Sequence, residues 1–383
     1  GIWKTRGAKD LQSYFKGNND AKWWGIGISI MATQASAITF LSTPGQAYAD
    51  GMRFIQFYFG LPIAMIILSV TFLPIFYKLK VYTAYEYLET RFDLKTRTLA
   101  AFLFLIQRGL ATGITIYAPS IILSTLLNWN LTLTNIFIGL LVILYTVSGG
   151  TKAVTQTQKQ QMAVMMGGMI LAGILVINML PNNISFLDAV NVAGKMEKLN
   201  LVNFDFNLED RYNFWTGTTA ALFLFLSYFG TDQSQVQRYL SGKSLAQSRL
   251  GLIMNGLLKI PMQLIILFIG VMVFVFYQFN TPPIFFNKVE LNNIKSSNYS
   301  EEVNNLENEF KILHDKKTVD IYSLLDAQKN EDKGRVQELK RSVLTIESKM
   351  QEINSNVKTI VIKNNPSAET NDKDYIFMSY VID

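Results

Sequence analysis

The chain has 383 residues, of which 49% are hydrophobic and 17% charged, with a formal net charge of +6. It contains no Cys and one His, which excludes a disulfide scaffold, a thiolate metal site, and catalytic or metal sites built from several histidines. The basic residues lie in short segments between apolar stretches, so the positive charge does not indicate nucleic-acid binding, and we expect no nucleic-acid partner.

Long uncharged stretches dominate residues 1–279. A bilayer core needs about 20 apolar residues in a helix, and a soluble helix is rarely uncharged on every face for that length. The sequence therefore predicts an all-α multi-pass membrane protein whose transmembrane core occupies residues 1–279. Seven spans are expected, at about residues 23–49, 54–77, 98–127, 131–149, 160–180, 213–231 and 249–279.

Lys and Arg are concentrated in the N-terminal segment and in the loops after the second, fourth and sixth spans. Cytoplasmic loops retain positive charge. We therefore expect a protein of the cell membrane, in contact with the lipid bilayer, with its N-terminus in the cytoplasm and residues 280–383 outside. The odd number of spans and the missing initiating Met indicate a fragment, with a further span beyond Asp383.

Residues 280–383 have a different pattern. Between Val303 and Val357, apolar residues recur at three- and four-residue spacing among Glu and Lys. This pattern predicts amphipathic helices, arranged as a two-helix hairpin that turns near residues 330–334. Two interpretations stay open: a solvated hairpin that closes on itself, or an arm that binds a partner, which the sequence does not identify.

The first and sixth spans are irregular. The first carries several hydroxyl residues and then Pro44-Gly45, which should free backbone carbonyls inside the membrane. The sixth is short, starts near Thr216 and ends in the polar run 227–233. Interrupted helices at equivalent positions of two five-helix halves are typical of a transporter site. The alternative is close helix packing through small residues.

Two basic residues fall within predicted spans. Arg108 lies about ten residues into the third span, and Lys259 lies near the start of the seventh. A charge inside the membrane is costly and usually functional. Alternatively, each side chain extends to the membrane surface from a helix end.

Five segments, in this order, resemble signatures of the sodium/solute symporter family. They are Ser36–Tyr48, Phe72–Tyr77, Tyr82–Phe92, Tyr145–Val154 and Asp232–Tyr239. The first three are similar to the branch that holds the sodium-coupled monocarboxylate and multivitamin transporters and the sodium/iodide symporter. The resemblance implies a leucine-transporter-like fold of two inverted five-helix repeats, of which this chain holds seven core helices.

The resemblance also implies site residues. The backbone carbonyls of Ala32 and Ala35 would bind the sodium ion, which is the one cofactor expected. Tyr228 matches an aromatic inner gate, and Lys259 matches a lysine that faces the substrate in sugar carriers.

Three further matching positions depart from the sugar carriers. Thr39, Tyr58 and Phe225 stand where those carriers use Gln, Glu and Asn to bind hydroxyls. A buried sugar hydroxyl would lack partners here, so we expect a small anion or carboxylate as the solute. Gln158 stands where many members have an Asp that serves a second sodium site, which implies one sodium ion per cycle.

We therefore expect a sodium-coupled secondary active symporter that imports a small solute by alternating access. The alternatives are a membrane sensor or signalling protein that uses a symporter-like module, and a carrier of a sugar or another solute from the same family. A channel would need a ring of repeated selectivity residues, which the sequence lacks. An enzyme is not expected, because no nucleophile–base or metal constellation is present.

Overall fold

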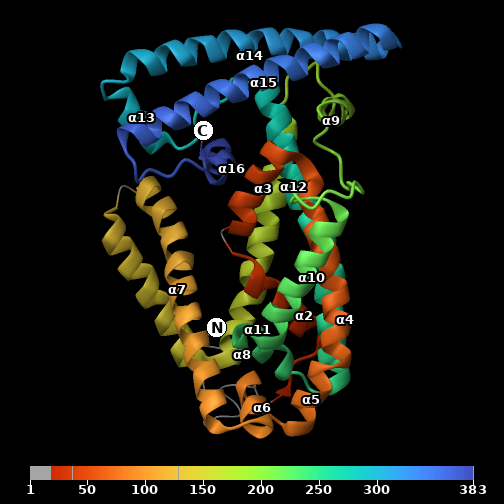
Figure 1. The fold of residues 1–383 in the computed structure, drawn as a ribbon, viewed down its shortest axis with the longest axis vertical. Coiled ribbons are helices and arrows are strands. Elements are labelled where there is room, and N and C mark those ends of the chain that lie inside the picture. The colour runs from red at the N-terminus through yellow and green to blue at the C-terminus, as the bar shows by residue number, and fades with distance from the viewer. Residues whose placement is uncertain (1–18, 37, 128, 383) are drawn as a thin grey trace. The chain divides into compact units, whose positions relative to one another are not determined.

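The computed structural model describes residues 19–36, 38–127 and 129–382. Every regular element in these ranges is a helix, apart from one isolated bridge between Ala21 and Gly242, and this confirms the all-helical class (Figure 1). The chain forms two compact units. Unit 1 comprises residues 1–39, 55–167 and 202–263, and unit 2 comprises residues 40–54, 168–201 and 264–383. The two units interleave along the chain because the long helices α8 and α12 contribute to both.

The helices of unit 1 are α2 (Trp23–Gln34), most of η4 (Gly51–Phe59), α4 (Gly60–Val70), α5 (Phe72–Leu79), α6 (Ala84–Arg91), α7 (Leu94–Leu127), the first part of α8 (Leu131–Asn178), α10 (Phe214–Thr231), α11 (Gln233–Leu240) and the first part of α12 (Leu245–Phe279). Unit 2 holds most of η3 (Ile38–Ser42), α3 (Thr43–Asp50), α9 (Phe186–Lys195), α13 (Lys288–Lys295), α14 (Ser300–Lys329), α15 (Lys333–Asn364), α16 (Lys373–Ile382) and the remaining parts of α8 and α12.

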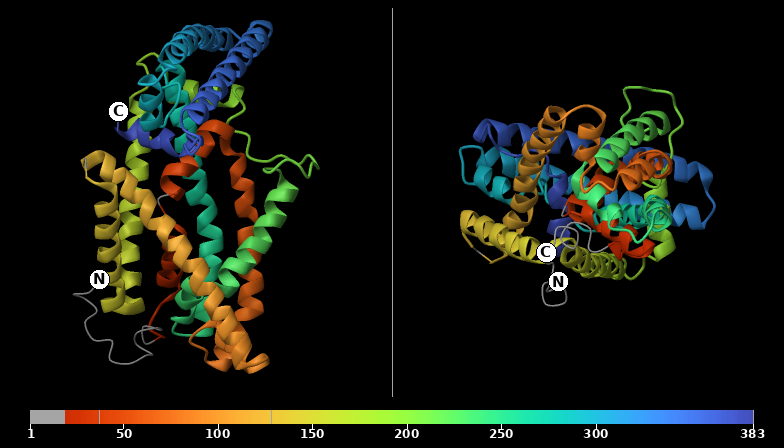
Figure 2. Two further views of the ribbon diagram at one scale, coloured as in Figure 1. Left: turned by 60° about the vertical axis from the view of Figure 1, so that its left-hand side comes forward. Right: turned by 90° about the horizontal axis from the view of Figure 1, so that it is seen from below.

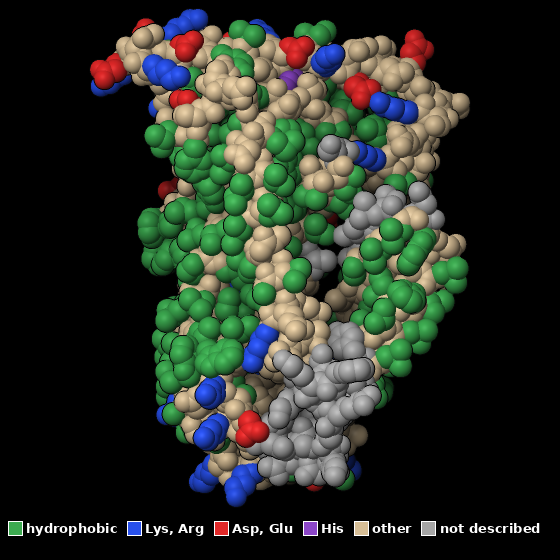
Figure 3. Space-filling model, turned by 180° about the vertical axis from the view of Figure 1, so that it is seen from behind, with side chains coloured by type: hydrophobic (Ala, Val, Ile, Leu, Met, Phe, Trp, Pro, Cys, Tyr) green, Lys and Arg blue, Asp and Glu red, His purple; other side chains and the backbone are tan. Residues whose placement is uncertain are grey.

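Four helical stretches within the described residues are long and apolar enough to cross a membrane. They are Ile38–Leu79, Leu94–Tyr117, Ala153–Asn178 and Leu245–Phe279, with a shorter apolar helix at Leu131–Leu144. Many large apolar side chains of α7 and α8 are exposed, and Figure 3 shows hydrophobic side chains over much of the helical surface. Exposed apolar side chains on long helices are what contact with lipid requires.

The first predicted span is divided, but not where Pro44-Gly45 suggested. Helix α2 ends at Gln34, Ala35 is extended (φ −81°, ψ 93°), and the next helical segment begins at Ile38. Pro44 instead lies in the first turn of α3. Proline is tolerated there, because backbone N–H groups of a first turn have no intrahelical acceptor. The predicted position of the break is therefore wrong by about two turns.

Helix α8 contains a second backbone irregularity. Gly150 has φ 57° and ψ −165°, which separates residues 131–149 from residues 151–178. Only glycine adopts such dihedral angles without strain. The chain thus becomes helical again at residue 151, earlier than the predicted start at residue 160.

The core of unit 1 is built on α4 and α10. Leu61, Met65 and Leu68 of α4 and Phe225 and Phe229 of α10 are buried in one hydrophobic cluster. Gly60 allows close approach, because a Cβ atom there would lie 2.6 Å from both the Leu222 nitrogen and the Thr218 oxygen. Small residues at a helix interface let the two backbones approach in this way.

Helices α14 and α15 of unit 2 form an antiparallel hairpin, in the segment where the sequence predicted one (Figures 1 and 2). Their apolar faces bury Phe310, Ile346, Met350 and Val357 in a cluster that α13 completes. The outer faces carry acidic and basic side chains in alternation (Figure 3). The two helices thus bury their apolar faces against each other and α13, and the partner-binding arm stays a prediction.

The hairpin is also bonded to the end of α12. His314 Nε2 lies 2.9 Å from the Tyr277 carbonyl oxygen, and the Thr318 hydroxyl donates to the Gln278 carbonyl at 2.8 Å. These bonds use carbonyls of the last turn of α12, which have no intrahelical donors.

Candidate functional site

The substrate residues expected from the sequence surround one cavity of unit 1, with a volume of about 300 Å³. They come from four separate segments of the chain, which the fold brings together. The lining consists of Gln34, Thr39, Tyr58, Leu224, Phe225, Tyr228 and Lys259, so Thr39, Tyr58, Phe225, Tyr228 and Lys259 are all present.

Aromatic rings form one wall of this cavity. The Phe225 ring centre lies 6.2 Å from that of Tyr58 and 5.5 Å from that of Phe57. Tyr228 packs edge-on against Phe229 at 5.2 Å, and its hydroxyl accepts a hydrogen bond from Gln235 Nε2 at 2.8 Å. Tyr228 is thus fixed at both its ring and its hydroxyl.

Lys259 supplies the positive charge of the cavity. Helix α12 begins at Leu245, so Lys259 lies well inside the helix, and its side chain is 2% exposed. No described residue places a carboxylate within salt-bridge distance of its amine. A buried, uncompensated cation is costly, so the cavity is suited to an anion.

Two further polar residues of α12 lie one turn on either side of Lys259. Asn255 and Gln263 are fully buried, and Asn255 Oδ1 and both polar atoms of Gln263 have no hydrogen-bond partner among the described residues. Buried polar groups normally have partners. This polar stripe was not predicted from the sequence, although its four-residue spacing within an apolar helix is the signal that reveals it.

The predicted sodium ligands lie where α2 ends. Ala35 N–H donates to the carbonyls of Met31 and Ala32, at 3.0 and 3.2 Å. The chain then leaves the helix, so the carbonyls of its last turn lack the next turn of donors. The described residues contain no cluster of acidic, His or Cys residues that could hold a metal ion. A site for a hard cation here would use carbonyl and hydroxyl oxygens, which suit sodium.

Gln158 of α8 connects directly to this part of α2. Its Oε1 accepts a hydrogen bond from the Ser29 hydroxyl at 2.7 Å, and its Nε2 donates to the Thr33 hydroxyl at 2.8 Å. Thr33 in turn donates to the Ser29 carbonyl at 2.7 Å. The amide thus binds two hydroxyls of α2 through both of its polar atoms.

Arg108 is paired, which the sequence analysis did not foresee. Its guanidinium lies 3.4 Å from the Asp232 carboxylate and also donates to the Ser234 hydroxyl. Asp232 caps α11 by accepting from the Ser234 N–H at 2.8 Å. Arg108 is therefore no free counter-charge for a solute.

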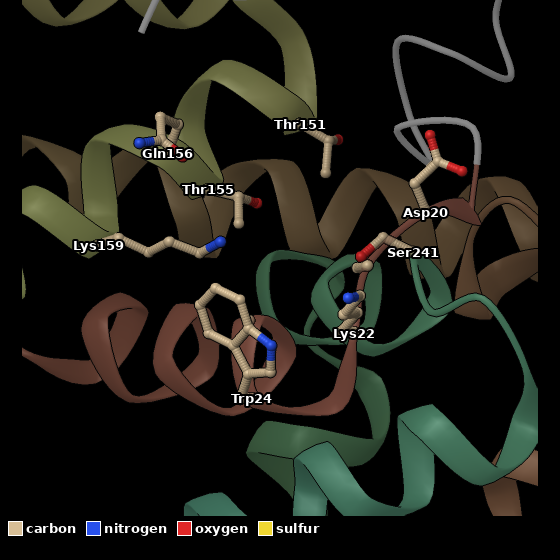
Figure 4. A pocket seen from close by; sticks show the side chains of 10 residues that line it. Asp20, Lys22, Trp24, Thr151, Thr155, Gln156, Lys159 and Ser241 are labelled. Carbon is tan, nitrogen blue, oxygen red and sulfur yellow. The ribbon is translucent and has the colours of Figure 1, made fainter.

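A second cavity of unit 1, of about 280 Å³, lies beside the start of α2 (Figure 4). Lys22, Lys159 and Asp20 contribute charges to it, and the Lys159 amine lies 4.4 Å from the centre of the Trp24 ring. Figure 4 shows the Lys159 side chain extended over that ring.

Comparison with known proteins shows the family. The profile of the Sodium:solute symporter family matches residues 14–299, which include every residue of the candidate site. The human sodium/iodide cotransporter is 30% identical over 285 residues, which are 72% of this chain and 43% of that protein. Sodium-coupled monocarboxylate transporter 1 of Xenopus laevis is 34% identical over 252 residues, which are 65% of this chain and 40% of that protein.

Two further matches are sialic acid symporters. The sodium/sialic acid symporter SiaT of Proteus mirabilis is 31% identical over 289 residues, which are 73% of this chain and 56% of that protein. A solved structure of a Na⁺-coupled sialic acid symporter, substrate-bound and outward-open, superimposes with a TM-score of 0.67 and 22% identity. The superposition covers 100% of this chain and 75% of the solved chain, so the two proteins share the leucine-transporter-like fold.

The chain spans 40 to 56% of the length of these relatives, which are transporters and not enzymes. The profile match ends at residue 299, and α14 begins at Ser300, so the hairpin lies outside the matched region. The helices long enough to span a membrane agree with a multi-pass membrane protein. On the extent of the profile match, the chain belongs to the sodium:solute symporter family.

Proposed function

We propose that this protein is a sodium-coupled secondary active symporter that imports a small anion, most simply a carboxylate. The observation that supports this function is the buried, unpaired Lys259 in a cavity otherwise lined by aromatic and small polar side chains. A carboxylate would neutralise the Lys259 ammonium through a charge-assisted hydrogen bond. The solutes in the names of the three relatives, iodide, monocarboxylates and sialic acid, are all anions at neutral pH.

Sodium would bind the carbonyl oxygens near Ala32 and Ala35. The same segment continues to Gln34 and Thr39, which line the solute cavity, and the Thr39 hydroxyl donates to the Gln34 carbonyl at 3.2 Å. A cation that orders this segment therefore also orders one wall of the cavity. By linkage, solute binding would favour sodium binding to the same extent.

The aromatic wall argues against a sugar. Phe225 offers no hydrogen bond, and the hydroxyl of Tyr58 is the single polar group that this residue contributes. The aromatic wall thus offers few partners to a sugar, and each sugar hydroxyl buried without one would cost about 1–3 kcal/mol.

The positive-inside bias of the loops supports an N-terminus in the cytoplasm and residues 280–383 outside the cell. In this orientation the cavity beside Trp24 and Lys159 would open toward the cytoplasm. Two lysines there, Lys22 and Lys159, would attract an anionic solute as it leaves the solute cavity.

The proposal is tested by reconstituting the full-length protein in proteoliposomes. Uptake of labelled lactate, pyruvate, iodide, glucose and sialic acid is compared with and without an inward sodium gradient. We expect sodium-stimulated uptake of one or more of the anions and none of glucose. Uptake that does not depend on sodium, or competitive inhibition by hexoses where monocarboxylates have no effect, would overturn the proposal.

A further inference from the structure

Unit 2 contains a cavity of about 390 Å³ that is separate from the solute cavity of unit 1. It is lined by the loop that follows α9, the end of α12 and the hairpin helices, and its volume falls within the ~300–1,000 Å³ typical of small-molecule sites. Helices α14 and α15 lie outside the region that the family profile matches, so part of the lining of this cavity comes from a segment outside that region.

The cavity holds an excess of positive charge. Lys317 is 3% exposed and donates to the Glu347 carboxylate at 2.9 Å. Lys198 donates to the Ala49 carbonyl at 2.5 Å, and its amine lies 4.6 Å from the centre of the Phe274 ring. Two ammonium groups therefore face one carboxylate.

The pKa values of these groups reflect this imbalance. Burial lowers the pKa of Lys198 despite the nearby carboxylates. Burial alone would raise the pKa of Glu347, but Lys317 and Lys198 bring it below its ordinary value. Glu347 is thus ionised at neutral pH and does not compensate both lysines.

The remaining charges of the lining cancel in pairs. Lys358 lies 2.9 Å from Asp372, and Lys373 lies 2.8 Å from Asp50. One positive charge remains, and Lys198, which has no carboxylate within salt-bridge distance among the described residues, carries it.

Two of the lining residues, Gln278 and Asn354, also carry a buried acceptor beside the cavity. Gln278 Oε1 and Asn354 Oδ1 have no hydrogen-bond partner among the described residues, while Gln278 Nε2 is occupied by the Phe274 carbonyl at 2.8 Å. An unsatisfied buried acceptor costs about 1–3 kcal/mol, and a ligand hydroxyl would remove this cost.

We propose that this cavity binds a small hydroxylated carboxylate of the sugar-acid type. Its carboxylate pairs with the Lys198 ammonium, and its hydroxyls donate to Gln278 Oε1 and Asn354 Oδ1. A simple carboxylate would leave the two acceptors unsatisfied, and a neutral sugar would leave Lys198 uncompensated. The site shares no residue with the solute cavity.

The test measures binding to the full chain in detergent micelles without sodium by titration calorimetry, because the proposed carboxylate binding in the solute cavity depends on sodium. Three probes are compared: D-gluconate, acetate and methyl glucoside. We expect gluconate to bind, and acetate and methyl glucoside to bind at least roughly tenfold more weakly, because each lacks one of the two interactions. Equal affinity for acetate and gluconate, or no binding of gluconate at millimolar concentration, would overturn the proposal.

Four variants locate the bound anion. Lys198→Met keeps the packing on Phe274 but removes the charge, and Asn354→Asp adds a repelling carboxylate. Each should lower gluconate affinity at least roughly tenfold. Two other variants should leave gluconate affinity unchanged. Lys259→Met changes the solute cavity, and Lys340→Met changes a hairpin residue whose amine pairs with Glu197 in the loop after α9.

The variants also separate this proposal from the proposed transport function. Loss of gluconate binding in Lys259→Met, with binding kept in Lys198→Met, would assign the anion to the solute cavity and refute the second site. If Lys198→Met does not fold, the test rests on Asn354→Asp. Gluconate binding by Asn354→Asp with wild-type affinity would refute the proposal. Absence of sodium-driven uptake would refute the symporter function and leave this binding intact.

Discussion

The Gln158 amide donates a hydrogen bond to the Thr33 hydroxyl at 2.8 Å, one residue after Ala32, whose carbonyl is a proposed sodium ligand. Its oxygen accepts from Ser29 at 2.7 Å, so the amide connects α8 to α2 without a charge. Affinity for a hard cation depends on the number of charged ligands. The neutral amide therefore favours a connection between two helices over a second sodium site at this position.

Sodium stoichiometry follows from this contact. We expect uptake to depend hyperbolically on sodium concentration, with a Hill coefficient near one, because the proposed site near Ala32 and Ala35 holds one cation. Gln158→Asp should supply the missing charge and raise apparent sodium affinity, and Gln158→Ala should not. A wild-type Hill coefficient clearly near two would contradict the single-site interpretation.

The charge of Lys259 should dominate solute affinity. Lys259→Met should weaken uptake of the transported anion by about 10- to 100-fold, the equivalent of one lost charge-assisted hydrogen bond. Lys259→Arg should restore part of the loss, since it keeps the positive charge. Lys340→Met, on the hairpin surface, is the matched control and should transport like the wild type. If Lys259→Met had the same KM for the anion as the wild type, Lys259 would not bind the solute, and the argument for an anionic solute would fail.

The pair formed by Arg108 and Asp232 should couple α7 to the start of α11. Thermal unfolding of Arg108→Ala, Asp232→Ala and the double variant gives a double-mutant cycle. We expect a coupling free energy of about 1 kcal/mol, because Arg108 is partly exposed and solvent weakens the interaction. Strict additivity of the two single variants would show that the contact does not stabilise the fold.

Acid should destabilise unit 2 through His314. Burial lowers the pKa of His314 below its ordinary value, so the folded state favours the neutral ring. This contribution to stability is present above the unfolded pKa of about 6.5 and is lost as the pH falls below it. The thermal unfolding temperature should therefore drop between pH 7.5 and pH 5.5. His314→Gln should show a smaller drop, and an equal drop in both proteins would exclude His314 as the cause.

The hairpin should be dispensable for transport, because the family profile ends before it begins. Replacing residues 296–370 by a short linker should preserve sodium-driven uptake. The deletion should lower thermal stability, since it removes the bonds from His314 and Thr318 to the end of α12. Complete loss of uptake by a folded, membrane-inserted deletion protein would mean that the hairpin has a direct role in the transport cycle.

The helical class, the hairpin and the solute cavity were accessible from sequence for different physical reasons. Apolar periodicity reports directly on helices, so it predicted α14 and α15 and their turn. The residues of the solute cavity were implied, by position, by the family resemblance, and the fold brings Thr39, Tyr58, Phe225 and Lys259 together. Their roles in binding stay predictions, as do those of Ala32 and Ala35.

The features that the sequence did not reveal are those that tertiary contacts determine. Pro44 indicated a helix break, but proline is harmless in a first turn, and the chain instead leaves the helix at Ala35, a residue with no tendency to break one. The pairs Arg108–Asp232 and Lys317–Glu347 join residues far apart in the chain, so no local pattern predicts them.

The close approach at Gly60 has a mechanical consequence. A Cβ atom at this position would collide with backbone atoms of Thr218 and Leu222, so α4 and α10 touch main chain to main chain. Two helices in such contact cannot slide or separate without opening a void between them. In the proposed transport cycle, α4 and α10 would therefore move together as one rigid pair.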